Sequence, residues 1–363
     1  MYKSRHKPRG GKIAAVRLSV LDLTPVRSDQ STPDALAATL RLARIADDLA
    51  YTRYWVAEHH NVASVAATSP AVLTAMIAAT TSRIRVGSGG VMLPNHAPLA
   101  VAEQFALLEA AHPGRIDLGI GRAPGADPVA SLVLRGGRGD RDNQALQSFP
   151  DNLSDVIALL GNAGVSVQLT DGAYVLKATP NALTRPRVFL LGSSIDSAQL
   201  AAEKGLPYVF GHHLFGEQTG EALACYRSRF VPSAFADEPV AFLTVNIVVA
   251  ETAQEATTLA LPHLHLQSRT ATGHPAGPLE LVEDAEQGAL TPQQQRIAQG
   301  ELERAVLGTP SEALAQLRDL AQRFGVDELM LNPVASAHRG ADPARSPGRE
   351  STLRLLAEAA WTK

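Results

Sequence analysis

The chain has very little cysteine and no surplus of charge. Its 363 residues include one cysteine, Cys225, so neither an intrachain disulfide nor a zinc site with several cysteine ligands can form. Lys and Arg number 33 and Asp and Glu 36, a formal net charge of -3, which argues against nucleic acid as a partner. No apolar run approaches the roughly 18 residues of a membrane span. The hydrophobic content of 45% is that of a folded globular protein.

The amino terminus is basic but lacks an apolar segment. Residues 1–12 contain five Lys and Arg residues, and a secretory signal would require an apolar stretch after them. We therefore expect residues 1–12 to be a disordered tail, residues 13–363 to form a single domain, and the protein to be cytoplasmic and without a membrane partner.

Eight short apolar runs alternate with helical patterns. Continuous apolar runs are typical of strands that are covered on both faces, as in a parallel sheet. Strand followed by helix, repeated eight times, predicts an α/β fold, a closed (β/α)8 TIM barrel, with a doubly wound open sheet as the alternative. The predicted strands are residues 16–21, 53–57, 84–93, 116–120, 188–191, 207–210, 242–249 and 328–331.

Four helix starts carry the same signal, a hydroxyl residue followed by proline. The hydroxyl oxygen caps the free N–H groups of the first turn, and proline suits the first helical position. After Thr309, Glu312 completes a capping box. Gly205 is predicted to end the helix over 194–204. The four pairs are Thr32-Pro33, Ser69-Pro70, Thr291-Pro292 and Thr309-Pro310.

Two stretches break the alternation. Residues 123–187 follow the fourth strand, and residues 265–299 precede the last helices; both are rich in polar residues, glycine or proline. Stretches of this length in a compact domain are usually lids or disorder. We interpret them as insertions in one domain, either of which can supply a lid over the carboxyl end of the barrel.

The residues after the strands suggest an anionic ligand. Gly192-Ser193-Ser194 lies between a strand and a helix start, where free N–H groups and hydroxyls can bind an anion. Arg122 follows the fourth strand and can form a bidentate contact to the same anion. A plain helix cap and a salt bridge at the rim are the respective alternatives. Together the two features favour a ligand with a phosphate group.

Gly89-Gly90 lies inside an apolar strand, where glycine weakens strand pairing. Either a planar ring approaches the backbone closely there, or the chain forms a packing bulge. His59 and His60 follow the second strand and point to opposite faces, so one of them enters the barrel mouth. A histidine at that place can act as acid, base or metal ligand. We assign no metal, because the first strand ends Leu21-Asp22-Leu23 and not in the His-x-His of many metal hydrolases.

The ordered motifs resemble those of a known family. These motifs span roughly residues 16–332, and any one of them is weak while the ordered set is specific. The chain resembles the bacterial luciferase-like flavin-dependent monooxygenases, also described as LLM class flavin-dependent oxidoreductases, and within them the non-luminescent branch with monooxygenases of antibiotic biosynthesis. The motifs are WVAEHHN at 55–61, IRVGSGGVMLP at 84–94, AEQ at 102–104, GRIDLGIGR at 114–122, LGSS at 191–194, GTP at 308–310 and GVDE at 325–328.

The resemblance implies a chemistry and a set of site residues. It implies a monooxygenase that takes reduced FMN from a separate NAD(P)H-dependent flavin reductase and uses O2, through a C4a-peroxyflavin, to oxidise a small organic substrate. By position, His59 matches the family's catalytic histidine. Gly89 and Gly90 match the pair whose cis peptide lies under the isoalloxazine ring. Arg122, Ser193 and Ser194 match the residues that contact the flavin phosphate, and Gly192, directly before the serines, is expected to bind the cofactor with them. A homodimer is the expected assembly.

Some positions depart from the family pattern. Gly121 stands where luciferase has a reactive cysteine, so light emission is not expected. Residues 335–349 are longer and more polar than the usual last link, which predicts irregular barrel closure or disorder there. Three other functions stay open: a deazaflavin (F420)-dependent hydride transfer, a metal-dependent hydrolase, and a catalytically silent flavin-binding barrel. The sequence does not define the substrate.

Overall fold

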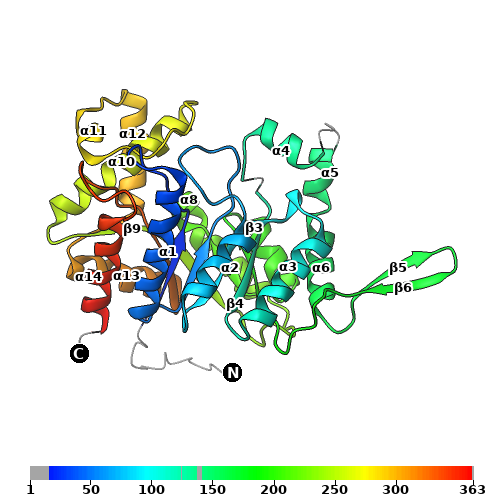
Figure 1. Ribbon diagram of the computed structural model, residues 1–363. Helices are drawn as coiled ribbons and strands as arrows, with labels where there is room; N and C mark the ends of the chain where they lie inside the picture. Colours follow the sequence, from blue (N-terminus) through cyan, green and yellow to red (C-terminus); the bar gives the residue numbers. More distant parts are fainter. Residues whose placement is uncertain (1–15, 124, 137–140, 362–363) are drawn as a thin grey trace, which may run out of the picture.

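The computed structural model describes residues 16–123, 125–136 and 141–361, and its centre is a closed barrel of eight parallel strands (Figure 1). The predicted tail of residues 1–12 lies outside the described part. The barrel closes because the last strands return to the first, which excludes the open-sheet alternative and confirms the (β/α)8 fold. All eight predicted strands are present. In barrel order they are β1 (Arg17–Asp22), β2 (Arg53–Val56), β3 (Arg85–Met92), β4 (Ile116–Gly121), β7 (Arg187–Gly192), β8 (Tyr208–Phe210), β9 (Ala241–Val249) and β11 (Glu328–Pro333).

Helices surround the barrel and cover the apolar outer face of the strands (Figure 1). Among the described residues no helix is both long and apolar enough to cross a membrane. The surrounding helices are α1 (Thr32–Asp48), α2 (Pro70–Thr80), α3 (Pro98–Ala111), α6 (Phe149–Leu160), α7 (Ile195–Glu203), α9 (Thr219–Arg229), α13 (Pro310–Phe324) and α14 (Pro347–Trp361).

The helix-start signals have different outcomes. Thr309 forms the predicted capping box with Glu312, and Thr291 caps its helix as predicted, in a capping box with Gln294 that was not predicted. Thr32 does not cap α1: Ser31 does, and its hydroxyl accepts the Asp34 amide while Thr32 lies inside the first turn. Ser69 stands at the cap of α2, but its side chain makes no capping hydrogen bond. Gly205 follows α7 with φ +62°, the left-handed conformation expected of a terminating glycine.

The two irregular stretches contain more regular structure than their composition indicates. In residues 123–187, α6 packs on α3 as a barrel helix, and a hairpin that the sequence analysis missed projects from the body (Figure 1). In residues 265–299 the chain is largely helical. The additional elements are α4 (Pro128–Leu134), α5 (Arg141–Gln147), β5 (Val165–Leu169), β6 (Gly172–Leu176), α8 (His212–Phe215), α10 (Ala253–Ala271), α11 (Val282–Gln287), α12 (Pro292–Arg304), β10 (Val306–Gly308), and the 3-10 turns η1 (Leu93–Asn95) and η2 (Gly216–Gln218).

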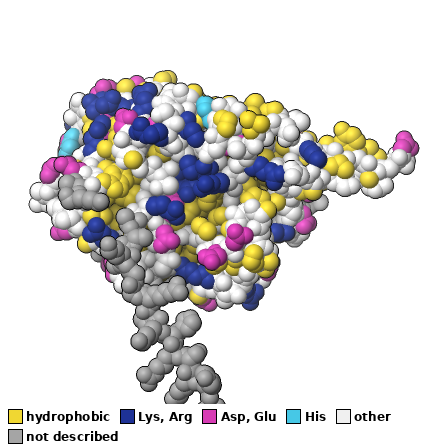
Figure 2. Space-filling model, turned by 90° about the horizontal axis from the view of Figure 1, so that it is seen from below, with side chains coloured by type: hydrophobic (Ala, Val, Ile, Leu, Met, Phe, Trp, Pro, Cys, Tyr) yellow, Lys and Arg dark blue, Asp and Glu magenta, His cyan; other side chains and the backbone are white. Residues whose placement is uncertain are grey.

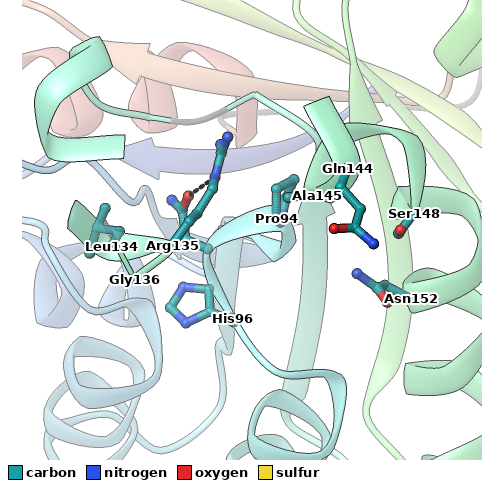
Figure 3. Close-up of a pocket in the computed structure, with 10 residues that line it drawn as sticks. Pro94, His96, Leu134, Arg135, Gly136, Gln144, Ala145, Ser148 and Asn152 are labelled. Carbon is teal, nitrogen blue, oxygen red and sulfur yellow. Dashed lines mark hydrogen bonds between the residues drawn. The ribbon is translucent and has the colours of Figure 1, made fainter. Parts of the chain in front are cut away.

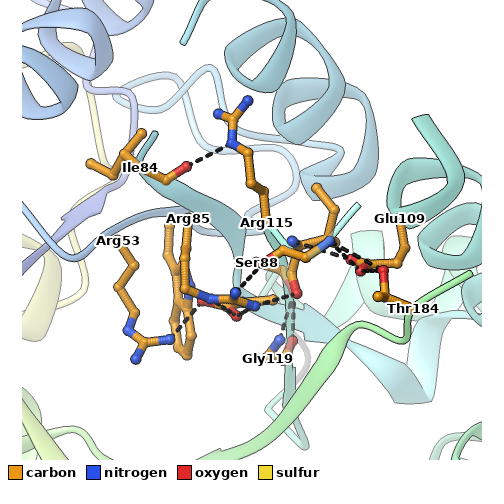
Figure 4. Close-up of polar contacts among 12 residues, drawn as sticks. Arg53, Ile84, Arg85, Ser88, Glu109, Arg115, Gly119 and Thr184 are labelled. Carbon is orange, nitrogen blue, oxygen red and sulfur yellow. Dashed lines mark hydrogen bonds and ion pairs between the residues drawn. The ribbon is translucent and has the colours of Figure 1, made fainter. Parts of the chain in front are cut away.

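The amino-terminal end of the barrel is filled by a buried ion-pair network. Arg53 is 4% exposed and binds two carboxylates: its Nη1 lies 2.7 Å from Asp117 Oδ2, and its Nε lies 2.6 Å from Glu328 Oε1. Arg85 donates to the other oxygen of Asp117 at 2.6 Å (Figure 4). Burial alone would lower the pKa of Arg53, but the carboxylates of Asp117 and Glu328 raise it above its usual value. Charge pairing therefore fixes the ends of four strands from inside the barrel.

Further arginines gather outside this network. Figure 2 looks at this end of the molecule and shows Lys and Arg side chains grouped near its centre. The neighbouring guanidinium of Arg85, and then burial, lower the pKa of Arg187, with Arg17 adding to the repulsion. The cations at this end thus outnumber the two buried carboxylates, which is why each carboxylate matters for stability.

The last link of the barrel, residues 335–349, is held in place by specific hydrogen bonds and an ion pair. Arg349 of α14 is 3% exposed; its Nη2 lies 2.5 Å from Asp22 Oδ1 on β1, and its Nε donates to the Pro333 carbonyl at 3.0 Å. The Ser336 amide donates to the Leu259 carbonyl at 3.0 Å. The expectation of irregular closure or disorder at residues 335–349 is wrong, because these polar groups make specific contacts to β1, β11 and α10.

Candidate active site

All seven predicted site residues line one cavity of about 550 Å³ at the carboxyl ends of the strands. This volume lies within the range of small-molecule sites, and the end of the barrel is the one that carries active sites in this fold. The structure thus brings together residues from four separate places in the sequence: the ends of β2, β3, β4 and β7. The seven are His59, Gly89, Gly90, Arg122, Gly192, Ser193 and Ser194.

His59 enters the cavity, whereas His60 turns to the opposite side of the backbone. Burial lowers the pKa of His59, with Glu58 acting in the opposite direction, so the imidazole is neutral at pH 7. Its Nδ1 is buried and has no hydrogen-bond partner among the described residues. A buried nitrogen without a partner is costly, so a ligand atom that bonds to it would be favoured.

The residue before His59 anchors this turn. Glu58 is fully buried and accepts hydrogen bonds from His60 Nε2 at 2.9 Å, from His96 Nε2 at 2.8 Å and from the Met92 amide at 2.9 Å. Burial would raise the pKa of Glu58, but these hydrogen bonds, that of His96 first, hold it below its usual value. The ionised carboxylate therefore ties the end of β2 to the end of β3 and fixes the backbone that carries His59.

The two glycines of β3 form a tightly packed wall of the cavity. Their peptide bond is cis, and the register between β3 and β4 shifts after Gly89, so the predicted packing bulge is present. A Cβ on Gly89 would lie 2.7 Å from Leu21 Cδ1, and one on Gly90 would lie 2.8 Å from the Gly119 carbonyl oxygen. The absence of side chains leaves a flat backbone surface facing the cavity.

The start of α7 combines a helix cap with free donors. Ser194 is the capping residue, and its hydroxyl accepts the Ser197 amide at 3.3 Å. Ser197 Oγ lies 2.8 Å from the Tyr208 hydroxyl, and a Cβ on Gly192 would lie 2.1 Å from the same Oγ, so glycine lets the helix approach the strand. The Ser194 hydroxyl is thus committed to capping, while the Ser193 hydroxyl makes no hydrogen bond within the described chain.

Arg122 stands exposed at the rim, next to this helix start. No acidic side chain lies within salt-bridge distance of it in the part of the chain that the structure describes, which removes the rim salt bridge as an explanation. A guanidinium without a carboxylate partner beside a helix amino terminus is suited to a phosphate.

Sequence reasoning missed a polar group on the opposite wall of the same cavity. Asn246 lies in the middle of the apolar strand β9, and Asn332 lies near the end of β11. They meet His263 of α10 and Thr244 of β9, and His213 of α8 lies beside them. A single asparagine inside the apolar run 242–249 was the available signal, because an amide there must find partners when buried.

A second cavity, of about 510 Å³, opens beside η1 and α5 (Figure 3). Arg135 Nε donates to Asn95 Oδ1 there at 3.2 Å, and His96 on its wall is the residue held by Glu58. Among the described residues no group of three or more His, Cys, Asp and Glu side chains is arranged to hold a metal ion.

Two histidines of the cavity wall make stability depend on pH. Burial lowers the pKa values of His213 and His263 to about 4, from 6.5. The unfolded chain therefore binds more protons than the folded one between these values, so the free energy of unfolding falls as pH drops from about 6.5 to 4. We expect a loss of about 1–2 kcal/mol per histidine between pH 7 and pH 5. Urea unfolding at the two pH values measures it.

The matched variants for this prediction are His263→Gln and His274→Gln. The first removes a group whose pKa is lowered in the folded protein and should reduce the loss, whereas His274 is exposed and its variant should behave as the parent protein. An identical loss in His263→Gln and in the parent would contradict the prediction.

Comparison with known proteins agrees with this site. The family model described as luciferase-like monooxygenase matches residues 16–328. The chain belongs to the luciferase-like monooxygenase family. It is 39% identical to protein YvbT of Bacillus subtilis (strain 168), over 91% of this chain and 94% of that one. It is 36% identical to the luciferase-like monooxygenase of Escherichia coli (strain K12), over 89% and 93%. Apo-MsnO8, at 34% identity and a TM-score of 0.82, covers 96% of this chain and 98% of its own.

More distant members of this luciferase-like fold bind different cofactors. The oxygenating constituent of 3,6-diketocamphane monooxygenase, solved in complex with FMN, has a TM-score of 0.68 at 17% identity and covers 95% of this chain and 98% of its own. An F420-dependent secondary alcohol dehydrogenase has a TM-score of 0.62 at 14% identity, over 96% and 99%. At these identities the likeness shows the fold alone, so the cofactor must be argued from this chain's own residues.

Proposed function

We propose that this protein is the oxygenating component of a two-component monooxygenase, which uses reduced FMN and O2 to oxidise a small organic substrate. The observation that carries the proposal is the exposed Arg122, which has no acidic partner among the described residues and lies beside the amino terminus of α7, in the same cavity as the flat glycine wall of β3. One end suits a phosphate and the other a planar ring. Membership in a monooxygenase family supports the same conclusion.

The residues present fit FMN. Arg122 and the Ser193 hydroxyl, with the free N–H groups of the first turn of α7, would hold the phosphate. The surface of Gly89 and Gly90 would support the ring, and His59 stands beside that surface with an unsatisfied Nδ1. When bound, the reduced flavin would supply two electrons, so that one oxygen atom of dioxygen enters the substrate and the other is reduced to water.

His59 would act by hydrogen bonding or proton transfer at the edge of the flavin. Because its pKa is lowered by burial, it holds one proton at neutral pH and offers both a donor and an acceptor nitrogen. The Glu58 anchor keeps the backbone of this turn in place, so the imidazole is positioned before the substrate arrives.

Water must be kept from the reaction, and the cavity mouth has apolar groups to do so. Leu214 and Phe215 of α8 line the cavity yet are 54% and 59% exposed. We propose that they are covered when the site closes; Gln267 of the second irregular stretch lines the same cavity. Closure of this mouth would also enclose the substrate in the cavity.

The proposal extends to partners and location. A flavin that must arrive reduced requires a separate NAD(P)H-dependent flavin reductase, and we propose that the protein works with one in the cytoplasm, as a homodimer.

An anaerobic titration tests the cofactor. The purified protein is titrated with chemically reduced FMN and, in parallel, with reduced F420, and is then mixed rapidly with oxygenated buffer. Binding of reduced FMN, and flavin reoxidation at a rate different from that in free buffer, would support the proposal. Binding of F420 alone would favour hydride transfer. Binding of neither would contradict both and leave a silent barrel.

His59→Ala is expected to retain FMN binding within about threefold and to reduce productive oxygenation by about 10²-fold or more, because acid–base groups contribute factors of this size. The affinity is measured by quenching of flavin fluorescence. The oxygenation is measured as the fraction of consumed reduced FMN that yields product instead of hydrogen peroxide, with a substrate found by screening. The control is His274→Ala, which changes an exposed histidine. Unchanged product yield in His59→Ala would contradict the role.

A further inference from the structure

We propose that five uncharged polar residues across the cavity from Gly89 and Gly90 form the substrate-binding wall, and that this wall recognises a neutral amide or carbonyl group. We name it the neutral wall; its residues are His213, Thr244, Asn246, His263 and Asn332. The inference rests on the proposed function, because it takes the glycine side of the cavity as the place of the flavin.

The barrel order puts the neutral wall on the side opposite the flavin support. Counted around the eight strands, β9 is four positions from β3, and β11 is three positions from it. Thr244 and Asn246 lie on β9 and Asn332 on β11. A ring lying against β3 would turn its open face toward these residues, so a substrate on that face must contact them.

A chain of hydrogen bonds fixes how the wall presents its atoms. Asn332 Nδ2 donates to Asn246 Oδ1 at 2.8 Å, and Asn246 Nδ2 in turn donates to His263 Nε2 at 3.3 Å. His263 therefore carries its proton on Nδ1. Both amides are thus held in one orientation by their neighbours and do not rotate freely.

The chain of bonds leaves one acceptor open. Asn332 is 5% exposed and lines the cavity, and its Oδ1 has no hydrogen-bond partner among the described residues. His213 also has one ring nitrogen without a partner. Its Nδ1 lies 2.5 Å from Thr244 Oγ1, and its Nε2 has no protein partner in the described chain. Both residues line the cavity, so a ligand that offers matching polar atoms can form hydrogen bonds to this amide oxygen and this imidazole nitrogen.

The wall has no charge with which to pair a charged substrate. The pKa values of His213 and His263 lie at about 4, so both rings are neutral at pH 7. The charged residues on the cavity lining are Arg122, on the phosphate side, and Glu301, whose carboxylate already binds Arg304 at 2.5 Å. A carboxylate or ammonium group placed against the wall would lose its hydration without a counter-charge.

Apolar side chains adjoin the wall and define the rest of the ligand. Leu21 and Val209 are 4% and 1% exposed, and Leu23 and Leu214 line the cavity with them. The substrate class that fits is an apolar body that carries an uncharged amide or carbonyl group.

The experiment compares three probes with the same apolar tail: octanamide, octanoate and octylammonium. Their affinities for the full-length, FMN-loaded protein are measured by ligand-observed NMR competition. Octanamide is expected to bind about tenfold or more tightly than either ion. In Asn332→Leu this preference should fall to about threefold or less, and in Asn332→Asp octylammonium should become the preferred probe. The control is Asn152→Leu, which alters the second cavity and should keep the preference.

Three results would overturn the inference: an ion that binds as well as octanamide, no octanamide binding to folded protein, or an unchanged preference in the Asn332 variants. If Asn332→Leu does not fold, Asn332→Asp decides the matter, since it keeps the size of the side chain. The same samples report FMN binding. Normal FMN binding without the amide preference rejects the wall and leaves the proposed function, whereas an amide preference in protein that cannot bind FMN rejects the function and leaves the wall.

Discussion

Asp117→Asn is expected to lower the free energy of unfolding by about 3–5 kcal/mol, because removal of one partner of a buried ion pair leaves the other uncompensated. Asp117 is fully buried between Arg53 and Arg85, and its Oδ2 also accepts from Trp55 Nε1 at 3.0 Å. The amide keeps the shape of the side chain and removes the charge. Glu328 alone would then face the buried guanidinium of Arg53 and the neighbouring Arg85.

Urea unfolding at pH 7 measures this loss. The matched control is Asp319→Asn, which removes the same charge from an exposed position of α13 and should change the free energy of unfolding by less than about 0.5 kcal/mol. The cavity lies at the opposite end of the strands, so FMN affinity of the folded variant should stay within about threefold of the parent. A loss in Asp117→Asn as small as that of the control would contradict the role of the network.

The strands of the barrel could be predicted because their signal is local. A run such as 242–249 is mostly apolar because both faces of the strand are covered, as is general for the strands of a parallel barrel. The hairpin β5–β6 gives no such signal: it projects from the body, and Leu169, Tyr174 and Val175 are more than half exposed. Its local signal is of another kind and was overlooked: Val165, Val167 and Leu169 alternate with polar residues, and Asp171-Gly172 is a typical hairpin turn. The composition of residues 123–187, taken alone, indicates only an insertion.

The site could be predicted in part, for a similar reason. Residues that follow strands, such as Arg122 and Ser193, must lie on one rim whatever the rest of the fold does. The hydrogen-bond partners of a residue depend on long-range packing. Glu58 binds His96, and Asn246 binds Asn332 across 86 residues of sequence. Neither pairing can be inferred from spacing, and the same holds for the Arg349–Asp22 contact that closes the barrel.

Arg122→Ala is expected to weaken FMN binding by about 10–100-fold and riboflavin binding by no more than about threefold. Hydrogen bonds to charged groups contribute roughly 1.5–3 kcal/mol, and riboflavin has the same ring and ribityl chain but no phosphate. Arg122 has no acidic partner in the described chain, so its removal leaves no buried charge behind and the fold should be unaffected. Titration of both flavins by fluorescence quenching measures the two changes.

Two further variants separate charge from geometry. Arg122→Lys retains a cation but loses the planar fork that binds two phosphate oxygens at once, so its FMN affinity should lie between those of the parent and Arg122→Ala. Arg135→Ala, in the second cavity, should change neither flavin affinity by more than about threefold. In the proposed binding mode the ring would rest on Gly89 and Gly90 and the phosphate on Arg122 and α7, so different strands would hold the two halves of the cofactor. Equal losses for FMN and riboflavin in Arg122→Ala would therefore place the guanidinium at the ring and contradict the phosphate contact.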